Sequence, residues 1–166
     1  MSEHPRLEAG EILRALREAD VRFVLIGGLA SQVHGSPSLT LDVDICFDLA
    51  NDNILRLAAV LADLSAIRRD MPSGVHAPLD ERALRAGDVF TLRTRYGDLD
   101  LLGHPDPSFD YQTLLEHSIE AEILGVRVRV SSLDDLMAMK RAAGRPKDRI
   151  ELEILGALRE EIDRRS

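Results

Sequence analysis

Two aspartates lie two residues apart in a segment where apolar and polar residues alternate. In residues 41–47, Asp42 and Asp44 alternate with apolar neighbours, a pattern typical of a β-strand with one apolar and one acidic face. Both carboxylates then point the same way, roughly 7 Å apart along the strand. Their repulsion favours a bound cation, and oxygen ligands without Cys or His favour Mg²⁺ or Mn²⁺ over zinc. Taken alone, the pattern also fits a charged edge strand that resists aggregation.

A second predicted strand carries the aspartates that could complete such a metal site. Asp98 and Asp100 share one face of residues 98–102, opposite Leu99 and Leu101. Either one could lie opposite the first pair, and strand alternation does not choose between them.

A glycine pair, Gly27 and Gly28, ends the strand predicted over 22–26. Where glycines turn a strand into a helix, backbone N–H groups can approach a phosphate closely. Most glycine pairs, however, mark only a turn.

Basic residues gather between positions 140 and 149, where the only acidic residue is Asp148. The segment is either a local site that attracts phosphates or a solvated helix end. Its five basic residues are Lys140, Arg141, Arg145, Lys147 and Arg149.

Helical and strand patterns alternate along the chain and predict an α+β or α/β domain with a mixed sheet of about five strands. No domain boundary is evident in 1–166, so a core over about 7–130 and C-terminal helices over about 132–164 are expected to form one domain. Residues 65–88 have no readable pattern. The predicted helices cover 7–19, 29–34, 53–64, 111–118, 132–143 and 146–164; the predicted strands cover 22–26, 41–47, 89–94, 98–102 and a hairpin that turns at Gly125.

Polar residues and glycines mark several predicted helix ends. Asn51 or Asp52 is expected to cap the helix over 53–64. Ser132 is expected to cap the helix over 132–143, and Gly144 to end it.

Composition and charge narrow the function classes. The formal net charge is −8, with 21 basic and 29 acidic residues, which disfavours nucleic-acid binding over the whole surface. The single cysteine, Cys46, cannot form an internal disulfide. The charged N-terminal segment is unlike a signal peptide, and no stretch is apolar enough to span a membrane. The chain is therefore predicted to be cytoplasmic, with no membrane partner.

The order of these motifs resembles the nucleotidyltransferase superfamily of polymerase-beta type, whose signature is a strand ending in hG[GS] and then [DE]h[DE]h. The match is FVLIGG followed by TLDVDICF. With YGDLDLLG and LDDLMAMKRAAGRPKD downstream, the chain resembles the small bacterial branch that includes AbiEii and MenT toxin-like proteins. The resemblance covers roughly residues 7–155 and implies a nucleotidyltransferase (polymerase-beta-like) fold.

The resemblance also assigns roles by position. It implies that Asp42 and Asp44 hold Mg²⁺ or Mn²⁺, and that Asp100 is the third carboxylate, both metal ligand and candidate base, with Asp98 as its competitor. The residues implied to bind the nucleoside triphosphate (NTP) are Gly27, Gly28, Thr40, Arg145 and Asp148, with Lys140 as a catalytic cation.

Two hypotheses of different classes follow. The first is a Mg²⁺-dependent transferase that moves a nucleoside monophosphate (NMP) from an NTP, ATP among the candidates, to a hydroxyl of RNA, for instance a tRNA 3′ end, or of a protein. Such an enzyme could be the toxin of a toxin–antitoxin pair, with a cognate antitoxin as partner. The alternative is a non-catalytic module that keeps the fold to bind a nucleotide or a partner protein.

Overall fold

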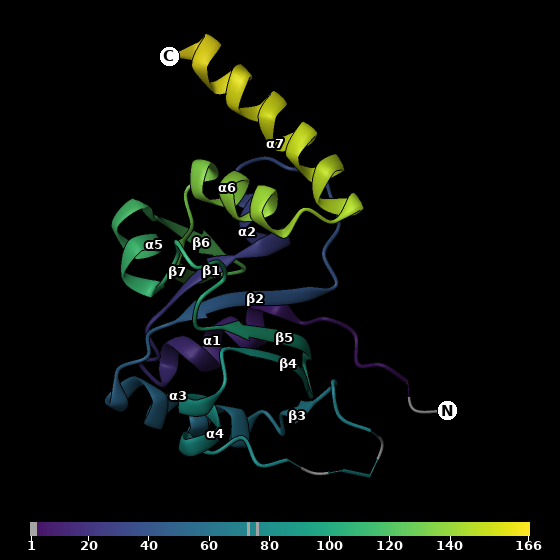
Figure 1. Ribbon diagram of the computed structural model, residues 1–166, viewed down its shortest axis with the longest axis vertical. Coiled ribbons are helices and arrows are strands. Elements are labelled where there is room, and N and C mark those ends of the chain that lie inside the picture. The colour runs from purple at the N-terminus through teal and green to yellow at the C-terminus, as the bar shows by residue number, and fades with distance from the viewer. Residues whose placement is uncertain (1–2, 73, 76) are drawn as a thin grey trace.

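A mixed sheet of seven strands runs through the protein, with helices on both of its faces (Figure 1). The computed structural model describes residues 3–72, 74–75 and 77–166. The strands are β1 (Phe23–Ile26), β2 (Asp42–Phe47), β3 (Ile67–Arg68), β4 (Val89–Thr94), β5 (Gly97–Leu102), β6 (Ile119–Ile123) and β7 (Val126–Val130). The helices are α1 (Ala9–Glu18), α2 (Gly27–Val33), α3 (Asn51–Asp63), α4 (Glu81–Ala86), α5 (Tyr111–His117), α6 (Leu133–Ala143) and α7 (Pro146–Arg165).

The strand order is β3-β4-β5-β2-β1-β7-β6. In the centre, β2 pairs with β1 antiparallel and with β5 in parallel, and β1 pairs with β7 in parallel. The α+β fold with a mixed sheet is as predicted, but the sheet has seven strands rather than about five. The hairpin contributes both β6 and β7, and the two-residue β3 lies within 65–88, where so short a strand leaves no alternation to read.

The hairpin turns at Leu124 and Gly125, whose φ angles are +51° and +82°. Positive φ at both central residues is the geometry of the tightest β-hairpin turns, and glycine adopts it without steric cost. The turn predicted at Gly125 is confirmed.

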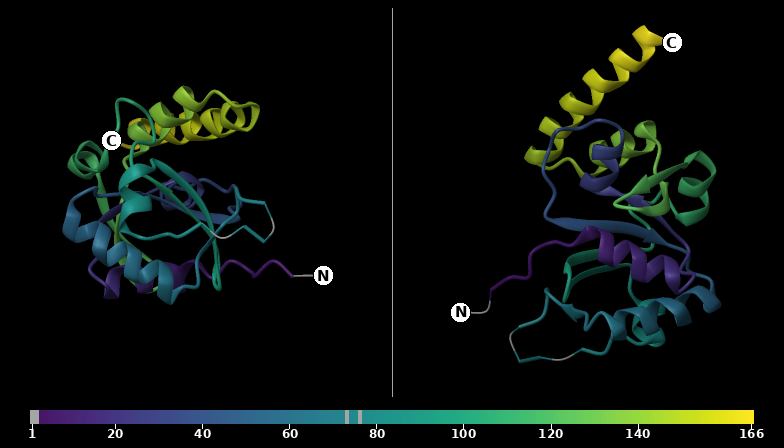
Figure 2. Two further views of the ribbon diagram at one scale, coloured as in Figure 1. Left: turned by 60° about the horizontal axis from the view of Figure 1, so that its bottom comes forward. Right: turned by 180° about the vertical axis from the view of Figure 1, so that it is seen from behind.

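Helices form layers on the two sides of the sheet. The left view of Figure 2 shows α1 and α3 on one side and α6 and α7 on the other. Helix α1 buries Ile12, Leu13 and Leu16 and packs against β2 and β7. Helix α2 packs against β1 and β2 and contacts α6, which in turn contacts α7. Within the described residues, no helix is both long and apolar enough to cross a lipid bilayer.

The ends of α6 follow the sequence prediction. The hydroxyl of Ser132 accepts a hydrogen bond from the Asp135 N–H at 3.1 Å. Gly144 ends the helix in the left-handed region, with a φ of +63°. Both predicted signals are confirmed, and α7 begins shortly after Gly144, at Pro146.

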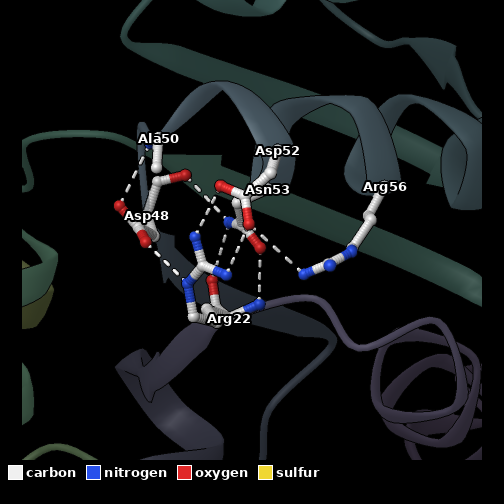
Figure 3. Close-up of polar contacts among 6 residues, drawn as sticks. All are labelled: Arg22, Asp48, Ala50, Asp52, Asn53 and Arg56. Carbon is white, nitrogen blue, oxygen red and sulfur yellow. Dashed lines mark hydrogen bonds and ion pairs between the residues drawn. The ribbon is translucent and has the colours of Figure 1, made fainter.

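The cap predicted for α3 is wrong, because Ala50 occupies the N-cap position. Asp48 instead accepts a hydrogen bond from the Ala50 N–H at 3.1 Å, and both oxygens of Asp52 accept hydrogen bonds from Arg22 (Figure 3). The Arg22 guanidinium also reaches Asp48 at 2.7 Å, so ion pairs join the start of β1, the end of β2 and the first turn of α3.

Asn53 is the buried centre of this junction (Figure 3). Its side-chain oxygen accepts a hydrogen bond from the Arg22 N–H at 2.7 Å. Its amide nitrogen donates to the carbonyl oxygens of Arg22 at 3.0 Å and Asp48 at 2.8 Å. One side chain thus bonds three backbone groups at the ends of β1 and β2, of which the Arg22 carbonyl also accepts a hydrogen bond from the Asp48 N–H at 3.2 Å.

We expect Asn53→Ala to lower the free energy of unfolding by about 2 to 3 kcal/mol, because it leaves buried backbone groups unsatisfied. Urea denaturation followed by circular dichroism measures the change. The control is Asp52→Ala, which removes an exposed partner of the same arginine and is expected to cost clearly less. Equal losses for both variants would contradict this reading of the junction.

Candidate active site

The parallel pairing of β2 and β5 aligns two pairs of aspartates across the sheet. Asp42 lies opposite Asp98, and Asp44 opposite Asp100. Alternation turns all four toward one face, while Val43, Ile45, Leu99 and Leu101 are buried on the other. The sheet therefore carries the acidic side chains on an apolar backing.

Three of these aspartates converge. One carboxylate oxygen each from Asp42, Asp44 and Asp100 lies within 4.8 Å of the others. Asp98 instead pairs with two arginines: Arg69 at 2.8 Å and Arg93 at 3.4 Å. The structure thus brings Asp100, rather than Asp98, together with the D-x-D pair.

Burial and repulsion make this cluster costly when its members are charged. Burial raises the pKa of Asp44 to about 8, and the charges of Asp42 and Asp100 add to the rise. Burial also raises the pKa of Asp100, although the neighbouring Arg69 partly offsets it. Such a site favours either protons or a bound cation.

Glycine keeps the cluster uncovered on the α2 side. Gly27 has a φ of +71°, and a Cβ there would lie 2.1 Å from a carboxylate oxygen of Asp44. A Cβ at Gly28 would lie 2.9 Å from the Thr40 hydroxyl, which in turn donates to the Asp42 carbonyl at 3.0 Å. The predicted residues Gly27, Gly28 and Thr40 therefore surround the aspartates, and both glycines are required by close packing.

Two of the five basic residues predicted between 140 and 149 gather around one buried carboxylate at the α6–α7 junction. Asp148 is fully buried and lies 3.5 Å from the Lys140 Nζ and 2.7 Å from the Arg145 Nε. Its carboxylate also accepts a hydrogen bond from the Arg145 N–H at 3.1 Å. Asp148 therefore lies beneath the two cations and holds them in place, so it is not exposed to a ligand.

The α6–α7 junction faces the acidic strand. Helix α7 lies beside the chain segment between α2 and β2 (Figure 1). Gly35, in that segment, lies against Leu158 of α7. Hydrogen bonding to Asp148 raises the pKa of Arg145, and the negative charge of Asp44 adds to the rise. The basic group is thus within electrostatic reach of the aspartate cluster.

We expect Asp148→Ala to lower the free energy of unfolding by about 2 to 4 kcal/mol at pH 7, because it leaves Lys140 and Arg145 without their shared anion. Burial opposes ionisation, but hydrogen bonds from Arg145 and the charge of Lys140 outweigh it and hold the pKa of Asp148 below its usual value. A group with a lowered pKa stabilises the fold above its unfolded pKa, about 4, and this contribution is lost as the pH falls further.

Urea denaturation at pH 7 and at pH 3 tests this expectation. The difference between wild type and Asp148→Ala should shrink at the lower pH. Glu153→Ala, an exposed change on the same helix, serves as the control and should alter stability little at either pH. A difference that is independent of pH would contradict the ionic role of Asp148.

Two residues at the site are not among those predicted from the sequence. Arg69 lies directly after β3, in the unreadable segment, and its guanidinium contacts both Asp98 and Asp100. Arg93 lies opposite Asp98 on β4. The alternation of residues 89–94 places Arg93 on a face with Thr91, but nothing in the sequence indicates Arg69.

Cys46 and His34 lie near the acidic strand without joining the cluster. Cys46 is fully buried, its Sγ lies 3.6 Å from the Gly103 carbonyl oxygen, and burial raises the pKa of its thiol to about 12. His34 pairs with the Ser131 carbonyl oxygen at 2.8 Å.

The donor set suits a hard divalent cation. It consists of carboxylate oxygens from two adjacent strands, packed against a glycine that has no Cβ to block them. Burial and the charges of Asp42 and Asp100 raise the pKa of Asp44, so a bound cation would favour its ionised form. Asp42, Asp44 and Asp100 thus fit the metal-binding role that the sequence resemblance implies.

Comparisons with known proteins show which fold carries this site. No family model and no curated protein matches the chain. Among solved structures, the lincosamide antibiotic adenylyltransferase LnuA with bound lincomycin is 16% identical, with a TM-score of 0.61 over 92% of this chain and 99% of its own.

Two further structures give similar scores. ANT(2")-Ia, in complex with adenylyl-2"-tobramycin, is 18% identical, with a TM-score of 0.55 over 94% of this chain and 95% of its own. An antigenic nucleotidyltransferase-like protein from Paracoccidioides brasiliensis is 18% identical, with a TM-score of 0.54 over 92% of this chain and 77% of its own. At these identities the likeness establishes architecture, and the chain therefore has the nucleotidyltransferase fold.

Proposed function

We propose that this protein is a divalent-cation-dependent nucleotidyltransferase, which moves an NMP unit from an NTP to a hydroxyl group and releases pyrophosphate. The observation that carries the proposal is the convergence of Asp42, Asp44 and Asp100 beside Gly27. The likeness to LnuA and ANT(2")-Ia, an adenylyltransferase and a protein solved with an adenylylated product, supports the same class of reaction.

Asp42, Asp44 and Asp100 are the residues that would hold Mg²⁺ or Mn²⁺. The bound cation would neutralise charge on the phosphorus oxygens and lower the pKa of the attacking hydroxyl. Asp100 lies at the β5 side of the cluster and is our candidate for the base that accepts the hydroxyl proton.

The remaining residues bind and orient the triphosphate. Lys140 and Arg145 would offset its negative charge, and Asp148 beneath them fixes their positions. Gly27 and Gly28 leave space for phosphate oxygens next to the aspartates, and Thr40 supports the backbone of Asp42. Holding the reacting groups in this way supplies much of the catalysis in phosphoryl chemistry.

We propose ATP as the first nucleotide to test and an RNA or protein hydroxyl as the acceptor, as the AbiEii and MenT resemblance implies. In that setting the protein would be a cytoplasmic toxin with a cognate antitoxin. The antibiotics in the LnuA and ANT(2")-Ia structures make a small-molecule hydroxyl a third acceptor class to include.

Label transfer tests the function directly. Purified protein is incubated with Mg²⁺ or Mn²⁺, each α-³²P-labelled NTP, and total RNA, a protein extract or a set of hydroxylated antibiotics. Products are resolved on RNA gels, protein gels and thin-layer plates. We expect label on one acceptor class from α-labelled but not γ-labelled NTP, and none when EDTA is present.

The result also separates the enzyme from the non-catalytic alternative. Asp63→Asn, an exposed carboxylate change on α3, should transfer label like the wild type. NTP binding without transfer to any acceptor would favour a binding module over an enzyme.

A further inference from the structure

Arg69 spans two aspartates that are neighbours on one face of β5. Its Nη1 donates to Asp98 at 2.8 Å, and its Nη2 donates to Asp100. The backbone N–H of Arg69 donates to the Thr91 carbonyl at 2.8 Å, which fixes the residue beside the sheet just past β3. The planar guanidinium fork fits two parallel carboxylates in a way that a lysine could not.

The two aspartates differ in what else surrounds them. Asp98 has a second cation, Arg93, and lies outside the converging group. Asp100 faces Asp42 and Asp44, and the only cation that contacts it among the described residues is Arg69. The Nε of Arg69 is buried and finds no hydrogen-bond partner in the described parts of the chain. The two carboxylates are therefore what hold this guanidinium in place.

A cation on Asp100 and a divalent ion in the cluster would compete for the charge of the same carboxylate. Asp100 uses one carboxylate oxygen, Oδ1, for Arg69. Like charges repel strongly at such short range, where solvent screens little. Arg69 also pairs with Asp98, which is not one of the converging aspartates, so it keeps one ion pair if it leaves Asp100.

We propose that Arg69 is a built-in counter-cation of the acidic cluster. In the cation-free protein it neutralises Asp100; when a divalent ion binds, it gives up Asp100 and stays attached through Asp98. Arg69 thus acts through Asp100 as a positioning residue that sets the affinity for the ion. This inference rests on the cation site of the proposed function.

Mn²⁺ binding to the nucleotide-free protein tests the inference without any turnover. Isothermal calorimetry or the electron paramagnetic resonance of free Mn²⁺ gives the dissociation constant. We expect Arg69→Gln to bind Mn²⁺ about tenfold more tightly than the wild type, because a competing charge is removed. Asp98→Asn should bind it several-fold more weakly, because Arg69 loses its other anchor and stays on Asp100.

The matched control is Arg68→Gln. Arg68 is the preceding residue, but it pairs with Asp70 and stacks on Phe90, so its loss should leave Mn²⁺ binding unchanged. A purely structural Arg69 would give a different pattern, since loosening the site would weaken binding in both Arg69→Gln and Asp98→Asn.

Several outcomes overturn the proposal: equal or weaker Mn²⁺ binding by Arg69→Gln, tighter or equal binding by Asp98→Asn, or no Mn²⁺ binding by wild type and Arg69→Gln alike. If Arg69→Gln does not fold, Arg69→Met, which also removes the charge, takes its place: tighter Mn²⁺ binding supports the proposal, and equal or weaker binding overturns it. Opposite shifts in the two variants support it even if label transfer fails, in which case only the enzymatic function falls.

Discussion

Asp44→Asn is expected to reduce nucleotidyl transfer by about 10³-fold or more while the protein remains folded. Asp44 is the central member of the cluster, between Asp42 on its own strand and Asp100 on the neighbouring strand. The amide of Asn lacks the charge that holds a divalent ion, and the loss of such an ion removes several kcal/mol of transition-state stabilisation. The substitution keeps the side-chain shape, so the packing against Gly27 survives.

The same substitution should stabilise the cation-free protein. Burial and two like charges raise the pKa of Asp44 to about 8, so at neutral pH this carboxylate must take up a proton on folding, which opposes folding. Replacing it with a neutral amide removes that opposition and is expected to add about 1 to 3 kcal/mol to the free energy of unfolding. A gain in stability that accompanies a loss of activity is the mark of a functional site.

Three measurements check this expectation: label transfer, urea denaturation in EDTA, and the rise in melting temperature on adding Mn²⁺. The wild type should gain stability with Mn²⁺, since any ligand that binds only the folded state stabilises it, and Asp44→Asn should not. Asp63→Asn is the control and should behave as the wild type in all three. Full transfer by Asp44→Asn would remove the aspartate cluster from the mechanism.

Local sequence patterns predicted the parts of this site that depend on local physics. The alternation of residues 41–47 put Asp42 and Asp44 on one face because strand side chains point to opposite sides in turn. Gly27 and Gly144 were readable because both hold positive φ angles that glycine adopts without strain.

Contacts between distant segments were beyond such patterns. Alternation placed Asp98 and Asp100 on one face. Their contacts in the fold depend on the register of β5 against β2 and on Arg69, which lies 29 and 31 residues before them in the chain. The segment that carries Arg69 has a two-residue strand and no period to detect. The burial of Asp148 was also beyond such patterns, because it depends on how α6 and α7 pack, whereas the sequence shows only an acidic residue among basic ones.

Asp100→Asn is expected to reduce turnover by about 10² to 10⁴-fold while NTP binding stays near that of the wild type, because the third carboxylate serves the attacking hydroxyl more than the triphosphate. Calorimetry with a non-hydrolysable NTP analogue, beside label transfer, separates the two effects.

Asp98→Asn is the matched comparison, since it changes the same side chain two residues earlier on the same face of β5. Asp98 lies outside the converging oxygens and is paired with Arg69 and Arg93. At saturating Mn²⁺, which offsets any weaker ion binding, its turnover should stay within about tenfold of the wild type. A loss confined to Asp98→Asn would reverse the assignment and make Arg69 and Arg93 the partners of the catalytic base. The parallel pairing of Asp44 with Asp100 favours the first outcome, because it brings Asp100 next to the carboxylate whose ionisation burial opposes.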